Sequence, residues 1–363
     1  MTKTPFFIHI GTWKTGSSTI QFNLHTVKSE LEREGIFYLS KSDKMVVDDA
    51  VIRSFTELNH DYILASRKKL SAILERKRAL NPAMRFIASA EEFSGDPFSG
   101  FENSGEVARN VFEITKDLNL DIKIIVYLRR QDDFIESLYT QSIHLGGHKT
   151  FDEFISDFNE DAFHWDKLLN SYAGVFGKEN IIVKRYHKSF LPENDSLIKE
   201  FGTILNSNVL MSFNKTNPRN RGISRDALEI TRITNQYLNS EDQYLLRSIF
   251  QESNAKQPFE SYAYMDSERR KSYLKRFSKS NALVSNAYFG DAIEKLFPED
   301  DIEHQNYLPY NGLTSDAVAL NLSKSIVTLH KKLKRLEDNL QHEIKKTGIR
   351  YKIKKALSRL IKG

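Results

Sequence analysis

Short apolar runs alternate with amphipathic stretches along the first half of the chain. Five runs have the length and the bounding residues of buried strands: Phe6–Ile10, Ile36–Leu39, Arg85–Ala90, Ile122–Leu128 and Asn180–Tyr186. Strands that are joined by helices form parallel sheets with helices on both faces. The pattern therefore predicts an α/β protein of three layers with a central, mainly parallel sheet.

Apolar residues recur at helical spacing between these runs. After the first strand they are Ile20, Leu24, Val27 and Leu31, and before the fourth they are Val107, Val111, Ile114 and Leu118. Residues from Asp48 to Leu80 are expected to be mostly helical, and Ser224 has the position of an N-cap for a helix that runs to about Leu238.

The first strand leads into a loop bounded by Gly11 and Gly16, where a backbone without Cβ atoms can approach a ligand closely. The following helix opens with hydroxyl side chains suited to capping it: Ser17, Ser18 and Thr19. The N–H groups of such a loop and the positive end of the helix dipole favour a phosphate or sulfate, and Lys14 adds a full charge.

The Walker A pattern places lysine directly after the second glycine, whereas this chain has Ser17 there. An ATPase or a kinase is therefore disfavoured. A strand–turn–helix whose glycines serve only the turn is the alternative interpretation of this loop.

Two further groups of charged residues follow predicted strands. Glu91-Glu92 comes after the third and Arg129-Arg130 after the fourth. Because ligands of parallel sheets bind beyond the carboxyl ends of the strands, these residues and the glycine loop are expected at one edge of the sheet. An arginine pair after a strand is also typical of a solvated or ion-paired strand end.

A lysine in the third place between the glycines, followed by Gly-Ser-Ser, resembles the loop that binds the 5′-phosphosulfate of 3′-phosphoadenosine 5′-phosphosulfate (PAPS) in sulfotransferases. Arg129 after a strand and Ser137 eight positions later resemble the pair that holds the 3′-phosphate in those enzymes. A planar guanidinium and a hydroxyl from a neighbouring element suit a dianionic phosphate. The chain is similar, over roughly its first 300 residues, to the bacterial-type PAPS-dependent sulfotransferase family, which has a P-loop-like fold.

This resemblance implies transfer of a sulfuryl group from PAPS to an acceptor hydroxyl without a divalent metal. It assigns the donor site to Lys14, Thr15, Gly16, Ser17, Ser18, Thr19, Arg129 and Ser137. Lys14 would also stabilise the leaving group. The family's Ser-x-Glu pattern at Ser89-Ala90-Glu91 assigns the catalytic base to Glu91, with Glu92 as the alternative.

The resemblance implies a glycan hydroxyl as the acceptor. A lipid or small-molecule alcohol is the alternative, and a non-catalytic binding or scaffold protein that retains the fold is the rival class. A nucleic-acid partner is not expected, because residues 324–363 carry 13 Lys and Arg against 3 Asp and Glu, which leaves the rest of the chain mildly acidic.

The chain has no cysteine, so disulfides and thiolate metal sites are excluded. The apolar run near the N-terminus is too short for a signal peptide, and no window resembles a membrane span. We therefore expect a cytoplasmic protein, with a catalytic domain over residues 1–312 and a basic helical tail over residues 313–363.

The tail has two apolar patterns. The first alternates spacings of four and three, as in a short coiled coil, through Leu322, Ile326, Leu329, Leu333, Leu336 and Leu340. The second lies among lysines and arginines beyond Gly348, as Ile349, Ile353, Leu357, Leu360 and Ile361. Three alternatives remain for the tail: it pairs chains into a homo-oligomer, it binds the inner membrane face peripherally, or its leucines pack on the body.

Overall fold

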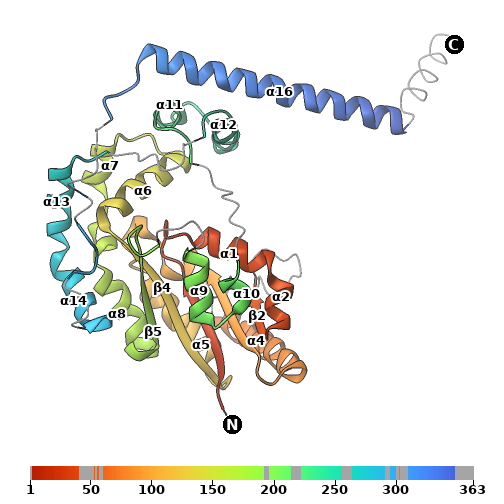
Figure 1. Cartoon of the computed structure of the whole chain (residues 1–363), viewed down its shortest axis with the longest axis vertical. Helices are drawn as coiled ribbons and strands as arrows, with labels where there is room; N and C mark the ends of the chain where they lie inside the picture. Colours follow the sequence, from red (N-terminus) through yellow and green to blue (C-terminus); the bar gives the residue numbers. More distant parts are fainter. Residues whose placement is uncertain are drawn as a thin grey trace. The chain divides into compact units, whose positions relative to one another are not determined.

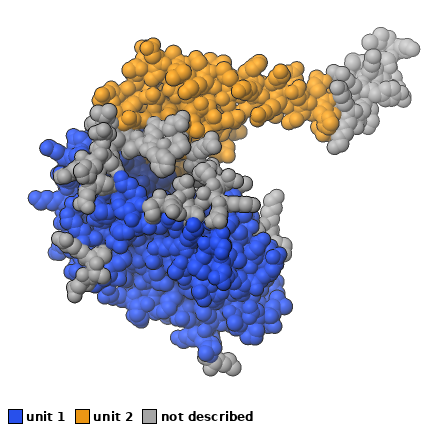
Figure 2. Space-filling model, viewed as in Figure 1, with its two compact units in different colours: residues 1–139, 151–218, 263–309 blue, residues 140–150, 219–262, 310–363 orange. Residues whose placement is uncertain are grey.

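The computed structural model describes residues 2–40, 53, 55–56, 60–191, 196–213, 222–255, 264–290, 295–299, 302 and 310–347. The chain divides into two compact units (Figure 2). Unit 1 comprises residues 1–139, 151–218 and 263–309, and unit 2 comprises residues 140–150, 219–262 and 310–363. The division into a catalytic domain over 1–312 and a tail over 313–363 stays a prediction.

Unit 1 is built on a five-stranded parallel sheet with the strand order β2-β3-β1-β4-β5 (Figure 1). The strands are β1 (Thr4–Ile10), β2 (Ile36–Leu39), β3 (Arg85–Ala90), β4 (Leu120–Arg129) and β5 (Ile181–Tyr186). β1 lies at the centre, where Phe6 is in register with Phe86 of β3 and with Ile122 of β4. The five predicted strands and the predicted α/β fold class are confirmed.

Helices α1 (Ser17–Thr26), α2 (Lys28–Arg33), α9 (Ser196–Leu205) and α10 (Asn208–Met211) cover one face of the sheet. The helix expected to run from Ile20 through Leu31 is divided at Val27. Two β-branched residues meet at this point, and the Thr26 hydroxyl bonds back to the Phe22 carbonyl at 2.8 Å. Ile20, Leu24, Val27 and Leu31 are nevertheless all buried in one apolar cluster.

Helices α4 (His60–Leu80), α5 (Ser104–Thr115) and α8 (Trp165–Phe176) form the layer on the other face. Adjacent residues of β2 contact opposite layers. Tyr38 belongs to the apolar cluster with α1, whereas the Phe37 ring centroid lies 4.3 Å from the Lys77 ammonium of α4. Unit 1 therefore has the three layers that the alternation of strands and helices predicts.

The start of α6 (Gln131–His144) and the helices α7 (Phe151–Asp157), α13 (Ser267–Arg276) and α14 (Ser278–Tyr288) complete the described helices of unit 1. Short 3₁₀ turns connect its elements: η1 (Glu91–Ser94), η2 (Pro97–Ser99), η3 (Glu160–Phe163) and η4 (Lys178–Asn180). Gln131 donates to the side chain of Asn281 at 2.7 Å, which ties the first turn of α6 to α14.

Unit 2 contains α11 (Arg225–Asn235), α12 (Ser240–Ser253) and α16 (Ser315–Thr347). Ser224 is the N-cap of α11, as predicted, and its hydroxyl accepts a hydrogen bond from the Ala227 N–H at 3.3 Å. The first apolar pattern of the tail lies on α16, while the pattern beyond Gly348 falls outside the described residues. None of the described helices has the length and hydropathy needed to cross a membrane.

Candidate anion-binding and catalytic site

The loop between β1 and α1 needs glycine at both ends. A Cβ atom on Gly11 would lie 2.8 Å from the Cβ of Ser17, because the loop curls back on itself. Gly16 has a φ of 80°, and a Cβ there would lie 2.5 Å from Leu197 and 3.1 Å from the Tyr186 ring. The tight turn thus brings the backbone of α1 up against the end of β5.

Two buried threonines hold the loop from within. The Thr12 hydroxyl donates to the Tyr127 carbonyl of β4, and the Thr15 hydroxyl donates to the Thr12 carbonyl at 2.5 Å. The Thr15 side chain, which was assigned to the donor site, therefore shapes the loop, and Lys14 next to it takes a left-handed φ of 62°. These bonds fix the backbone before any ligand arrives.

Hydroxyl side chains were expected to cap the first turn of α1, but they do not. Gly16 is the N-cap residue, and no described side chain caps this helix end. Ser17 is buried and donates its hydroxyl to a carboxylate oxygen of Glu91, whereas Ser18 and Thr19 are exposed. Because the N-cap residue is a glycine, which has no side chain to accept from the first amides of α1, this helix end offers the donors and the dipole that an anion requires.

Glu91 and Glu92 begin the η1 turn directly after β3, so the alternation of a strand does not govern their directions. Glu91 is half-buried and contacts the loop through Ser17, while Glu92 is exposed. The structure therefore brings the preferred candidate for the base to the glycine loop.

The structure separates the arginine pair. Arg129 donates from Nη1 to the Lys14 carbonyl at 2.8 Å, and its guanidinium lies 5.8 Å from the Tyr186 ring centroid. The Trp165 indole N–H donates to the Arg129 carbonyl at 3.1 Å and fixes the end of β4. Arg129 is thus a half-buried cation at the rim of the loop.

Arg130 points into unit 1, where it is 1% exposed. Its guanidinium donates to both carboxylate oxygens of Asp132, at 2.7 and 3.0 Å, and Arg270 of α13 donates to the same carboxylate at 2.7 Å. The adjacent Asp133 also faces Arg130. Burial by itself would raise the pKa of the Asp133 carboxyl, but the positive charges of Arg130 and the other nearby arginines outweigh burial and hold that pKa below its ordinary value. Arg130 therefore belongs to a buried ion network, which is the ion-paired interpretation of the arginine pair.

Ser137 lies on α6, eight positions after Arg129, and is half-buried. Its assignment to the 3′-phosphate stays a prediction, as do the assignments of Ser18 and Thr19 to the 5′-phosphosulfate.

His9, which was not among the predicted site residues, is fully buried beneath the loop. Its Nδ1 lies 2.8 Å from the Ser89 hydroxyl, and its Cε1 lies 3.2 Å from the position of a Cβ on Gly11. Burial lowers the pKa of His9 from 6.5 to about 3, so the ring is neutral. A polar residue within the apolar run Phe6–Ile10 was the signal available in the sequence.

Tyr186 was also missed as a site residue, although its strand was predicted. It ends β5 beside Gly16 and Arg129. The carboxyl ends of β1, β3, β4 and β5 thus meet at one place, which is where ligands of parallel sheets bind.

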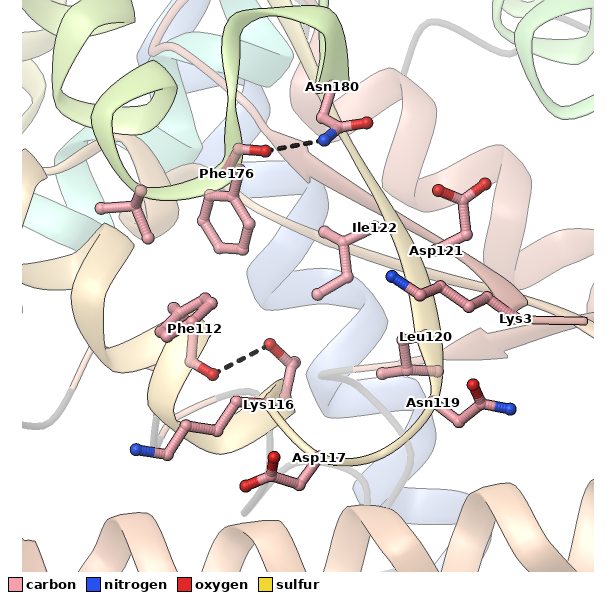
Figure 3. A pocket seen from close by; sticks show the side chains of 12 residues that line it. Lys3, Phe112, Lys116, Asp117, Asn119, Leu120, Asp121, Ile122, Phe176 and Asn180 are labelled. Carbon is pink, nitrogen blue, oxygen red and sulfur yellow. Dashed lines mark hydrogen bonds between the residues drawn. The ribbon is translucent and has the colours of Figure 1, made fainter. Parts of the chain in front are cut away.

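A cavity of about 440 Å³ lies away from this site, at the amino ends of β1, β4 and β5 (Figure 3). Its lining includes Lys3, Phe112, Asp117, Ile122 and Asn180, and none of the predicted site residues. Within the described part of the chain, no three His, Asp or Glu side chains are placed to hold a metal ion.

No family model matches the chain. An uncharacterised protein of Archaeoglobus fulgidus is 25% identical over 196 residues, which are 53% of each protein, so the chain spans about half the length of this relative. A sulfotransferase of Alicyclobacillus acidocaldarius has a TM-score of 0.35 and 14% identity, over 67% of this chain and 99% of that one. The sulfotransferase domain of the Synechococcus PCC 7002 olefin synthase has a TM-score of 0.32 and 9% identity, over 76% of this chain and 95% of that one. At TM-scores this low, the two likenesses say nothing about function, which has to be judged from the site itself.

Proposed function

We propose that the protein is a PAPS-dependent sulfotransferase that transfers a sulfuryl group to an acceptor hydroxyl. The observation that carries this proposal is the convergence of three strand ends on one loop. Ser17 of the loop–helix junction contacts Glu91 after β3, and Arg129 at the end of β4 contacts the Lys14 carbonyl. An anion-binding backbone, a carboxylate and two cations thus share one edge of the sheet.

The residues present suit a donor with two anionic ends. The uncapped amides of α1 and the Lys14 ammonium would hold the 5′-phosphosulfate. Arg129, fixed at the loop rim by its bond to Lys14, would hold the 3′-phosphate together with Ser137. Lys14 lies within the loop and takes a left-handed backbone conformation with a φ of 62°.

The roles of the side chains follow from the charges that the reaction moves. Glu91 would take the proton of the acceptor hydroxyl, whose oxygen forms the new bond to sulfur. The bond between sulfur and the bridging oxygen breaks, and its electron pair remains on the 5′-phosphate, where Lys14 would stabilise the growing negative charge. Ser17 would orient the Glu91 carboxylate through the hydrogen bond between them.

For the acceptor we propose a glycan hydroxyl, with a lipid or small-molecule alcohol as the alternative. Trp13 precedes Lys14 and meets Phe98 edge-to-face, with 5.9 Å between the ring centroids. Both rings are half-buried, so they supply an aromatic surface beside the loop against which the apolar face of a sugar ring can pack.

Calorimetric titration tests the proposal without knowledge of the acceptor. Adenosine 3′,5′-bisphosphate should bind to the full-length protein, and ATP with Mg²⁺ should bind much more weakly. Arg129→Gln should weaken the binding of the bisphosphate, whereas Lys69→Gln, at an exposed position on α4, should not. Preferential binding of ATP with Mg²⁺ would reject the proposal in favour of a kinase, and binding of neither would leave a protein that does not use this donor.

A further inference from the structure

Helix α16 presents a row of apolar side chains to solvent. The members of this row, here called the seam, are Leu322, Ile326, Leu329, Leu333, Leu336 and Leu340. Their exposed fractions range from 39% to 65%. Six exposed aliphatic side chains on one helical face form a contiguous apolar surface, which is the usual mark of an interaction site.

A different face of α16 packs within unit 2. Its buried residues are the small and polar Asn321, Ser325 and Thr328. The Asn254 side chain of the α12 C-cap donates to the Asn321 carbonyl and to the Ser325 hydroxyl, each at 3.2 Å. The seam is therefore left out of the packing that these residues make within unit 2.

The seam has the heptad order of a two-stranded coiled coil. Ile326, Leu333 and Leu340 take the a positions, and Leu322, Leu329 and Leu336 take the d positions. Leucine at d with a β-branched residue at one of the a positions favours pairing of two helices. Because the seam runs for fewer than three heptads, the pairing should be weak, and the dimer should therefore form only as the protein concentration rises.

Charges beside the seam agree with a parallel arrangement. Lys332 takes a g position and Glu337 the following e position, and these positions face each other across a parallel pair. Lys332 also contacts Glu252 of its own chain at 3.0 Å, yet a third of its side chain stays exposed. Two symmetric Lys332–Glu337 pairs would thus flank the centre of the interface.

We propose that α16 pairs in parallel with α16 of a second copy of this chain and that the seam is the interface. This proposal is independent of the sulfotransferase assignment, because it uses no residue of the glycine loop or of the strand ends.

Sedimentation equilibrium of the full-length protein at increasing concentration tests the proposal. The mass should rise from 42.0 kDa toward twice that value. Leu333→Glu should hold the protein at the monomer mass. Val327→Glu is the matched control, because Val327 is an apolar residue of α16 that is 53% exposed and lies outside the seam, so this variant should associate like the wild type. Circular dichroism should show equal helix content in all three proteins.

The same measurements can overturn the proposal. A wild-type protein that stays monomeric at the highest concentration rejects it, and so does an equal loss of association in Val327→Glu and Leu333→Glu. If the monomeric protein instead co-sediments with vesicles of anionic lipid, a membrane covers the tail and the paired-helix proposal is wrong.

A single cysteine tests the direction of pairing, since the chain has none of its own. Leu336→Cys occupies a d position, and in a parallel pair the two copies of residue 336 meet. Under oxidising conditions this variant should form a disulfide-linked dimer, whereas Lys334→Cys, outside the seam, should not. Association without cross-linking at position 336 would contradict the parallel arrangement.

Discussion

The Ser17 hydroxyl donates a hydrogen bond to the Glu91 carboxylate although 74 positions separate the two residues. The contact exists because β1 and β3 are adjacent and parallel, so that the residues after each strand emerge at the same edge of the sheet. It joins the N-terminal end of α1 to an acidic side chain that directly follows β3.

Replacing Glu91 by Gln should slow transfer while sparing the binding of donor product. The loss of a general base typically lowers turnover by about 10²- to 10⁴-fold. Glutamine keeps an oxygen that can accept from Ser17, so the loop should keep its shape. Steady-state kinetics of Glu91→Gln and of the adjacent, exposed Glu92→Gln would measure this. A loss confined to Glu92→Gln would assign the base to Glu92.

Lys14→Ala should abolish transfer in a folded protein. Loss of a charge that acts on the transition state costs about 10²- to 10³-fold or more in turnover. The left-handed backbone at this position carries the same strain for alanine as for lysine, so the unfolding free energy should change little. Kinetics and urea unfolding should be compared with those of Lys69→Ala. Turnover within a few-fold of the wild type would remove Lys14 from the mechanism.

The two neighbouring arginines should behave differently. Arg129→Gln should weaken binding of adenosine 3′,5′-bisphosphate by about 2 to 3 kcal/mol, since it removes a charged donor at the loop rim. Ser137→Ala should weaken it less. Arg130→Gln should instead lower the free energy of unfolding by about 3 kcal/mol, because it breaks the buried pair with Asp132. Equal effects of the arginine variants on binding and on stability would contradict this division of roles.

His9 should make the fold sensitive to acid. Its pKa is about 3 in the folded protein and 6.5 in the unfolded chain, so between these values only the unfolded chain binds the proton. The free energy of unfolding should therefore fall by ~1.4 kcal/mol per pH unit as the pH drops below 6.5. Urea unfolding of His9→Gln at pH 6.5 and pH 5 should show a smaller loss than the wild type, and identical losses would refute this assignment.

Local sequence pattern determined much of this protein. The five strands, the glycine loop and the N-cap at Ser224 were predicted correctly, because each depends on residues that are close along the chain. The order of strands and helices also indicated that the loop, Glu91 and Arg129 would follow strands of one parallel sheet.

Only the tertiary structure decided the burial and the hydrogen-bond partners of neighbouring residues. Arg129 and Arg130 are adjacent residues of the same type, so the sequence does not distinguish them. Arg130 is buried because it shares the Asp132 carboxylate with Arg270, which lies 140 positions further along the chain. The direction of the Ser17 hydroxyl likewise depends on Glu91, and the exposure of the seam depends on the polar residues through which α16 meets α12. Burial and hydrogen bonding are set by elements far apart in the chain, so periodicity within one element cannot specify them.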